Sequence, residues 1–200
     1  MNEIESVLEF WFGVCGADGA IDPVKRKMWF GDSRKHDAEI RDRFGALHER
    51  ASRGELESAW APTPQGRLAL IVVLDQFSRH IHRGTPRSFA QDLAAQRLAV
   101  AGIEQAMDRT LLPAQRAFFY LPLEHAESVE LQRLSLRCFE QLANAVAPAR
   151  RKDYESFLDY ARRHRDTIER FGRFPHRNAV LGRVSTAEEA EFLKQPGAWF

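Results

Sequence analysis

The segment of residues 63–82, TPQGRLALIVVLDQFSRHIH, constrains the fold more than any other part of the chain. Apolar residues fill positions 68–74 and return at Phe77 and Ile81, so a helix drawn through the segment is apolar on nearly every side. The β-branched middle would suit a buried strand equally well, but the spacing that continues beyond it favours a helix. The pattern therefore predicts a buried central helix.

Proline and capping residues divide the rest of the chain into further helices. Four dipeptides have the residues typical of a helix start, with proline in the first turn: Asp22-Pro23, Thr63-Pro64, Leu112-Pro113 and Leu121-Pro122. Ser185 and Glu188 have the spacing of a capping box, in which each side chain satisfies a backbone N–H near the other residue. A last helix is expected to follow them.

Apolar side chains within residues 40–51 and 154–171 recur every three or four positions, which is the spacing of one helical face. Gly172 can end the second of these helices in a left-handed conformation. The alternation typical of strands is not sustained anywhere, and 200 residues without a long linker fit one domain. We predict an all-α fold, a single domain over residues 1–200 of antiparallel helices around the central helix, with residues 195–200 as a tail.

Composition narrows the classes of function. A formal net charge of +1 argues against a uniformly basic nucleic-acid-binding protein. The N-terminal MNEIESVLEFWFG lacks the basic start of a secretory signal, and the longest apolar run is far shorter than the ~18 residues that span a bilayer. Cys15 and Cys138 are isolated, as in proteins of reducing compartments. We expect a cytoplasmic protein without a membrane-spanning segment.

Asp75 and Arg79 lie on the predicted central helix, in line with Leu68 and Ile71. They are four residues apart and can pair, and a buried charge is tolerated only when it is paired. The pair is explained either by a structural role in holding the helix in register or by contact with a ligand.

Glu124 and Glu127 fall on the apolar stripe of the helix that Pro122 is expected to start. Acids in a first helical turn are favoured by the helix dipole, which explains the residue type. The dipole does not explain why both residues fall on the apolar stripe. Their place on this stripe leads us to expect that both carboxylates point inward.

The stretch HRDTIERFGRFPHRN, residues 164–178, combines basic, imidazole and aromatic groups. On a helical projection Arg165 lies within the apolar stripe, beside His164. Residues 161–183 contain seven arginines and two acids, a local charge of +5. This cluster is either a solvated arginine-rich face or an anion site, because the planar guanidinium suits carboxylate and phosphate.

Other motifs carry less weight. His164-Arg165-Asp166 spells a kinase triplet, but no glycine-rich loop or DFG accompanies it. His80, His82, Glu124, His125 and His164 are potential metal ligands, yet no HExxH or Glu-x-x-His spacing is present. We therefore predict neither a metal site nor a cofactor.

Three separated motifs carry a resemblance to a known family: LALIVVLDQFSRHIHRGTPRSFAQD, FFYLPLEHAES and HRDTIERFGRFPHRNAVLGRVSTAEEAEFL. With them, the chain from VLEFWFG to EFL resembles the uncharacterised bacterial family catalogued as domain of unknown function 924. The resemblance implies an all-α fold related to tetratricopeptide-repeat proteins and no established activity. No 34-residue repeat is readable in the sequence itself.

The polar motif positions of that family correspond here to Asp75, Gln76, Arg79, Glu124, His125, Glu127, His164, Arg165, Arg173, His176, Arg177 and Asn178. Two residues depart from the family pattern: Ser78 stands where proline is usual, and His80 stands where asparagine is usual. The departures leave the Asp75–Arg79 pair intact.

We expect a pocket between helices that binds a small anionic molecule, because carboxylates and arginines from three distant segments point inward. The expected lining is Asp75, Arg79, Glu124, Glu127, Arg165 and Arg177. In an enzyme, Glu124 or Glu127 would be the general acid or base, His125 or His164 would carry the proton, and Arg165 with Arg177 would hold the anion.

Two other functions remain open. A repeat-like interaction module would hold a peptide or acidic tail in a groove, and its C-terminal GAWF could dock into a neighbouring copy in a homo-oligomer. RNA binding through the cluster of residues 162–183 is the weaker alternative.

Overall fold

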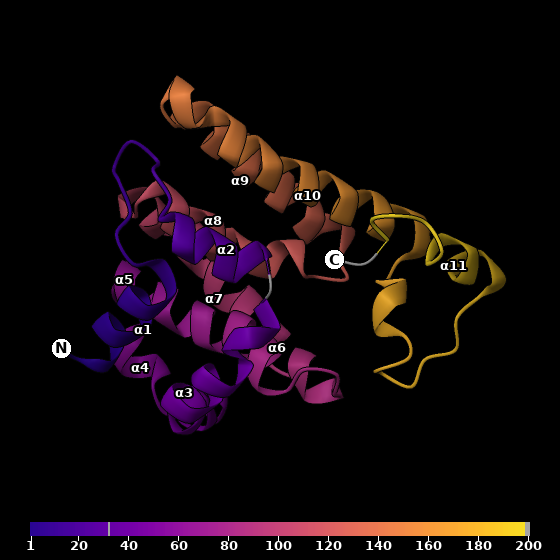
Figure 1. Ribbon diagram of the computed structural model, residues 1–200, viewed down its shortest axis with the longest axis horizontal. Helices are drawn as coiled ribbons and strands as arrows, with labels where there is room; N and C mark the ends of the chain where they lie inside the picture. Colours follow the sequence, from indigo (N-terminus) through magenta and orange to yellow (C-terminus); the bar gives the residue numbers. More distant parts are fainter. Residues whose placement is uncertain (32, 199–200) are drawn as a thin grey trace.

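The computed structural model describes residues 1–31 and 33–198, and these residues form helices and turns with no strand among them (Figure 1). In chain order the α-helices are α1 (Glu3–Phe12), α2 (Pro23–Phe30), α3 (Asp37–Ser52), α4 (Glu57–Trp60), α5 (Pro64–Ile71), α6 (Ser78–Ile81), α7 (Asp92–Glu104), α8 (Pro113–Glu124), α9 (Val129–Ala145), α10 (Arg151–Phe171) and α11 (Ala187–Phe192). Five short 3-10 turns connect them: η1 (Ser33–His36), η3 (Pro86–Phe89), η4 (Met107–Thr110), η5 (Pro148–Arg150) and η6 (Pro175–Arg177).

The predicted central helix is present and continuous. Thr63 caps its start by accepting a hydrogen bond from the Gly66 N–H, and the helix runs through α5, a π-helical turn η2 (Val72–Phe77) and α6. All residues from 66 to 75 are buried, because α1, α3, α7 and α8 contact this helix. Burial on all sides explains why apolar residues occupy its whole circumference.

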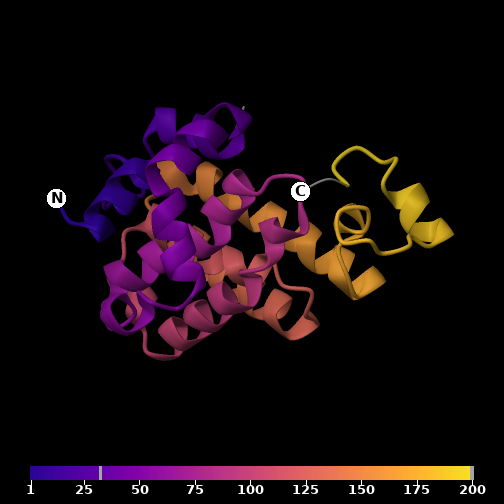
Figure 2. The same ribbon diagram turned by 90° about the horizontal axis from the view of Figure 1, so that it is seen from below.

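The later helices cover this core in order. α8, α9 and α10 pack pairwise, and α10 is the long amphipathic helix whose apolar stripe faces inward, with Tyr154, Phe157 and Ala161 buried. Gly172 ends α10 with φ 69°, as predicted from the sequence. The segment after it, with η6 and α11, lies at the end of the molecule opposite the N-terminus (Figure 2). The described chain forms a single all-α domain.

One predicted helix start was wrong. Pro122 does not start a helix, because it lies inside α8 near its C-terminal end, where the missing N–H costs only one hydrogen bond. The next helix, α9, begins after Ser128, whose hydroxyl accepts from the Leu131 N–H. Glu124 therefore ends α8, and the dipole argument for a first-turn acid does not apply to it.

The capping box near the C-terminus is shifted by one residue from its predicted place. Thr186 accepts from the Glu189 N–H, and Glu189 accepts from the Thr186 N–H. In the predicted tail, Ala198 is buried, while Trp199 and Phe200 of the GAWF sequence lie outside the described residues. No described helix has the length and apolar character needed to cross a membrane.

Candidate functional site

A cavity of about 460 Å³ lies among α2, the central helix, α8, α10 and the loop after α10. Its volume is within the range typical of small-molecule sites. One set of lining residues is aromatic: Trp29, Phe30, Phe89, Phe118, Phe157 and Tyr160. A second set is polar or ionisable: Gln76, Arg79, His80, Arg83, Glu124, His125, His164, His176 and Arg177. Seven of the predicted site residues therefore line one cavity.

Asp75 lies in the π-helical turn and is fully buried. Its carboxylate Oδ1 is 2.8 Å from His125 Nδ1 and 3.1 Å from Arg79 Nη1, and Gln76 donates a hydrogen bond to its Oδ2. Burial raises the pKa of Asp75, but the charges of Arg79 and His125 and the hydrogen bonds outweigh it and hold the pKa below the usual value. Asp75 is therefore ionised at neutral pH. The predicted Asp75–Arg79 pair is confirmed.

The protonation of His125 follows from this contact. An ionised carboxylate only accepts hydrogen bonds, so His125 Nδ1 carries the hydrogen and Nε2 carries the lone pair. Burial, followed by the Arg79 charge, lowers the pKa of His125, so the ring is neutral at neutral pH. Asp75 thus orients an imidazole on the cavity wall in the way that the acid of a catalytic triad orients its histidine.

Glu124 and His164 form a second contact at the cavity. Glu124 is 3% exposed, and its Oε1 lies 3.3 Å from His164 Nδ1, which donates to the Tyr160 carbonyl at 2.8 Å. Glu124 Oε2 is buried without a hydrogen-bond partner among the described residues. Burial, and then the charge of Asp75, raises the pKa of Glu124 well above its usual value, which favours the protonated form of this carboxyl. Burial lowers the pKa of His164 well below its usual value.

Asp92, at the start of α7, is a functional candidate that the sequence did not reveal. It is buried and accepts from Arg79 Nη1 and Nη2 at 3.0 and 3.2 Å and from Arg177 Nη1 at 3.2 Å. The balance of charge is the signal that could have identified it. Arg79 and Arg177 are both inward-facing cations, and Asp75 alone cannot balance them, so a further carboxylate is required.

Arg177 extends from η6 toward Asp92. Its side chain is buried, donates to the His125 carbonyl at 3.0 Å, and lies over the rings of Phe89 and Phe174 at 4.7 and 4.5 Å. Its Nε has no hydrogen-bond partner among the described residues. Burial, and then repulsion from Arg79, lowers the pKa of Arg177 to about 10, so the guanidinium is still charged at neutral pH.

The prediction that Arg165 points inward was wrong. Its side chain is 28% exposed and pairs with Asp166 at 2.5 Å and Glu169 at 3.9 Å on the surface of α10. A helical projection places only the Cα–Cβ direction, and a long side chain at the edge of an apolar stripe can turn its charged end to solvent. Arg165 is not part of the cavity lining.

Glu127 also differs from the prediction. It follows the end of α8 and is bound to the C-terminal loop, accepting from the Phe174 N–H at 2.8 Å and from Arg183 at 2.7 and 2.9 Å. Both of its oxygens are engaged, and it does not line the main cavity. The projection failed because it assumed one helix through a position where the chain turns.

Arg173 and Asn178 hold the C-terminal segment together and do not line the cavity. Arg173 binds Glu189 at 2.6 and 2.8 Å, and the buried Asn178 donates to Ser185 at 3.0 Å. His176 of the same loop does line the cavity. Burial, and then the Arg177 charge, lowers its pKa to about 3.

The basic cluster of residues 161–183 is largely neutralised by acids. Its ion pairs are Arg163–Asp159, Arg165–Asp166, Arg170–Glu188, Arg173–Glu189, Arg177–Asp92 and Arg183–Glu127. This pairing gives no support to RNA binding, which requires cations available to phosphate.

Comparison with known proteins agrees with the fold. The chain is similar to a protein of unknown function from Agrobacterium tumefaciens whose structure is solved, at 33% sequence identity and a TM-score of 0.80, over 96% of this chain and 97% of the other. No curated protein matches it. A family model described as "Bacterial protein of unknown function (DUF924)" matches residues 7–197. The chain therefore belongs to this bacterial family of unknown function, DUF924.

Proposed function

We propose that the cavity binds a small molecule that has an anionic group and an apolar or aromatic body. The observation that carries the proposal is a pair of buried polar atoms without a partner. Glu124 Oε2 and Arg177 Nε both belong to cavity-lining residues and lack a hydrogen-bond partner among the described residues. Burial favours the protonated, hydrogen-donating form of Glu124, and buried polar atoms are normally satisfied, so an acceptor-rich ligand fits them.

The charges around the cavity favour an anion over a cation. Arg79 and Arg177 are balanced by Asp75 and Asp92, yet the pKa of Arg177 is lowered by burial and by Arg79, so its charge is not fully compensated. A guanidinium that is already held in place loses little entropy on binding a carboxylate or phosphate.

The aromatic residues support an apolar body. Phe118 is 4.5 Å from Trp29 between ring centroids, and Phe30 and Phe157 are 5.3 Å apart. Phe30 and Tyr160 are 50% and 43% exposed, so they are accessible to an entering molecule. Aromatic side chains in the wall are typical of small-molecule sites.

The same site has the groups for proton transfer. The Asp75–His125 pair supplies an oriented, neutral imidazole as a base, and Glu124 supplies a protonated carboxyl as an acid. Compared with exposed groups, His125 has a lowered pKa and Glu124 has a raised pKa. Acid–base catalysis uses pairs of groups whose pKa values are shifted in opposite directions. Catalysis is the second part of the proposal and requires that binding be established first.

The test uses matched probes, benzoate with benzamide and 2-naphthoate with 2-naphthamide, measured by calorimetry and ligand-observed NMR. We expect the carboxylates to bind and Arg177→Met to weaken them by roughly tenfold or more, since charge-assisted hydrogen bonds contribute about 1.5–3 kcal/mol. The amides are expected to change little. Arg165→Met is the control, because it removes an arginine of the same region outside the cavity. Equal binding of acids and amides, or equal effects of the two variants, would contradict the proposal.

The remaining expectations stay predictions. They are the tetratricopeptide-repeat-like arrangement, the cytoplasmic location, the peptide-binding alternative and self-association through GAWF. The polar groups of the cavity are buried among apolar side chains, whereas a peptide groove requires accessible polar groups, so the small-molecule proposal is favoured.

A further inference from the structure

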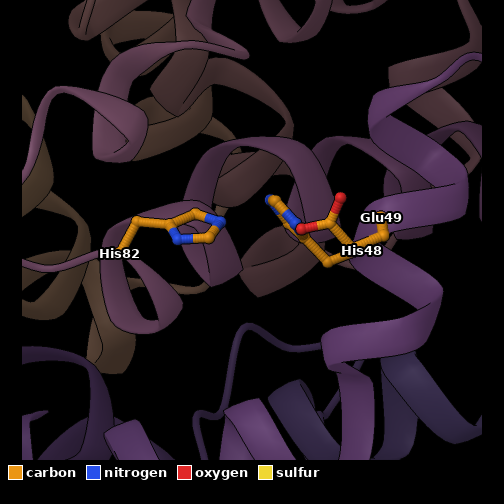
Figure 3. A group of neighbouring side chains, drawn as sticks. All are labelled: His48, Glu49 and His82. Carbon is orange, nitrogen blue, oxygen red and sulfur yellow. The ribbon is translucent and has the colours of Figure 1, made fainter.

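Three side chains with metal-ligating atoms meet between α3 and the end of the central helix. His48 and Glu49 lie on α3, and His82 follows α6. One atom from each, two ring nitrogens and a carboxylate oxygen, all lie within 4.8 Å of one another. Figure 3 shows the His82 ring directed toward His48 and the carboxylate of Glu49. We propose that His48, Glu49 and His82 bind a divalent transition-metal cation such as Zn²⁺.

The hydrogen bonds around His48 prepare it as a ligand. The Ser78 hydroxyl donates to the Leu74 carbonyl at 2.6 Å, so the Ser78 oxygen is the acceptor for His48 Nε2, which is 2.8 Å away. Nε2 therefore carries the hydrogen, and Nδ1 carries the lone pair. A histidine that ligates a metal through one nitrogen ordinarily donates from the other, which sets the tautomer and the ring orientation.

The nitrogens available to a metal are His48 Nδ1 and His82 Nε2, and neither has a hydrogen-bond partner among the described residues. His48 is 2% exposed, and its Nδ1 is buried without a hydrogen-bond partner among the described residues. His82 Nε2 is likewise buried without a partner there, and the two rings are 5.1 Å apart between centroids. Two buried ring nitrogens without a partner, on rings this close together, are unfavourable unless a cation or a water satisfies both.

Glu49 completes the ligand set. Its Oε1 accepts a hydrogen bond from Arg87 Nη2 at 2.8 Å. A tetrahedral Zn²⁺ places its ligand atoms about 3.4 Å apart, so the group closes by at most about 1.4 Å. Glu49, at 48% side-chain exposure, has room for this rotation. Two histidines and one glutamate leave a coordination position for water.

The test is a zinc titration of the full-length protein after treatment with a chelator, with a chromophoric zinc indicator as competitor. Co²⁺ binding, followed by its visible absorption, reports the coordination geometry. We expect one equivalent to bind, and His82→Ala and Glu49→Gln to weaken the affinity by roughly tenfold or more. His36→Ala is the matched control, since it removes a histidine outside the group, and the affinity is expected to be unchanged.

Arg87→Ala is the sharper variant, because Arg87 competes with the metal for Glu49 and its side chain is 62% exposed. Removing it is expected to tighten zinc binding severalfold without loss of fold. A protein that binds no zinc at micromolar concentration would overturn the proposal and indicate a bridging water. Zinc binding that His82→Ala and Glu49→Gln leave unchanged would place the metal elsewhere and overturn it too.

Discussion

Asp92 offers the strongest test of how the polar network of the cavity, formed by Asp75, Arg79, Asp92 and Arg177, is held together. Its carboxylate accepts from Arg79 and from Arg177, and its side chain is 10% exposed. Asp92→Asn keeps the shape of the side chain but removes the charge. Arg79 retains Asp75 at 3.1 Å, whereas Arg177 loses its only ion-pair partner among the described residues.

The expected loss follows from the burial of Arg177, whose side chain is 7% exposed. Removing one partner of a buried ion pair typically costs about 3–5 kcal/mol, because the remaining charge is left without compensation. For a domain of this size, each kcal/mol lowers the melting temperature by about 2–4 °C, so the total shift is roughly 6–20 °C. Adding Arg177→Met removes the orphaned charge, so the double variant is expected to lose less than the two single variants together.

Urea unfolding followed by tryptophan fluorescence measures these free energies. Asp166→Asn is the control, because its pair with Arg165 lies at the surface and exposed pairs contribute roughly 0–1 kcal/mol. A loss below about 1 kcal/mol for Asp92→Asn, or strict additivity with Arg177→Met, would show that the network does not depend on this carboxylate.

Three further variants test single positions. Because the folded-state pKa of Glu124 is raised, its contribution to stability is fully present below the unfolded value and is lost as pH rises through the folded pKa. Glu124→Gln is therefore expected to flatten the decline of stability as pH rises above the usual range of a carboxyl pKa, and an unchanged slope in urea unfolding across pH would refute the assignment. Gly172→Ala, at φ 69°, is expected to destabilise the fold by about 1 kcal/mol, whereas Gly45→Ala inside α3 should stabilise it by about 0.5–1 kcal/mol. Equal effects of the two alanines on the unfolding midpoint would contradict the backbone argument.

Local patterns in the sequence were sufficient for the fold class. The central helix, the stripe of α10 and the left-handed Gly172 follow from side-chain periodicity and backbone preference, which act within a few turns of chain. The inward position of Asp75 was predictable for the same reason, because it lies on an apolar face of its own helix. Glu124 is buried as expected, but it was predicted on the stripe of a helix starting at Pro122 and instead ends α8.

Tertiary structure alone decided which groups meet. Asp92 joins Arg79 and Arg177, and Arg165 turns to Asp166, because side-chain partners depend on how distant elements pack and not on the projection of one helix. The aromatic wall of the cavity and the two-histidine group at His48 likewise come from segments far apart in the chain. Sequence periodicity specifies the direction of a side chain around its own axis. The distance to its partner is determined only when the helices are packed.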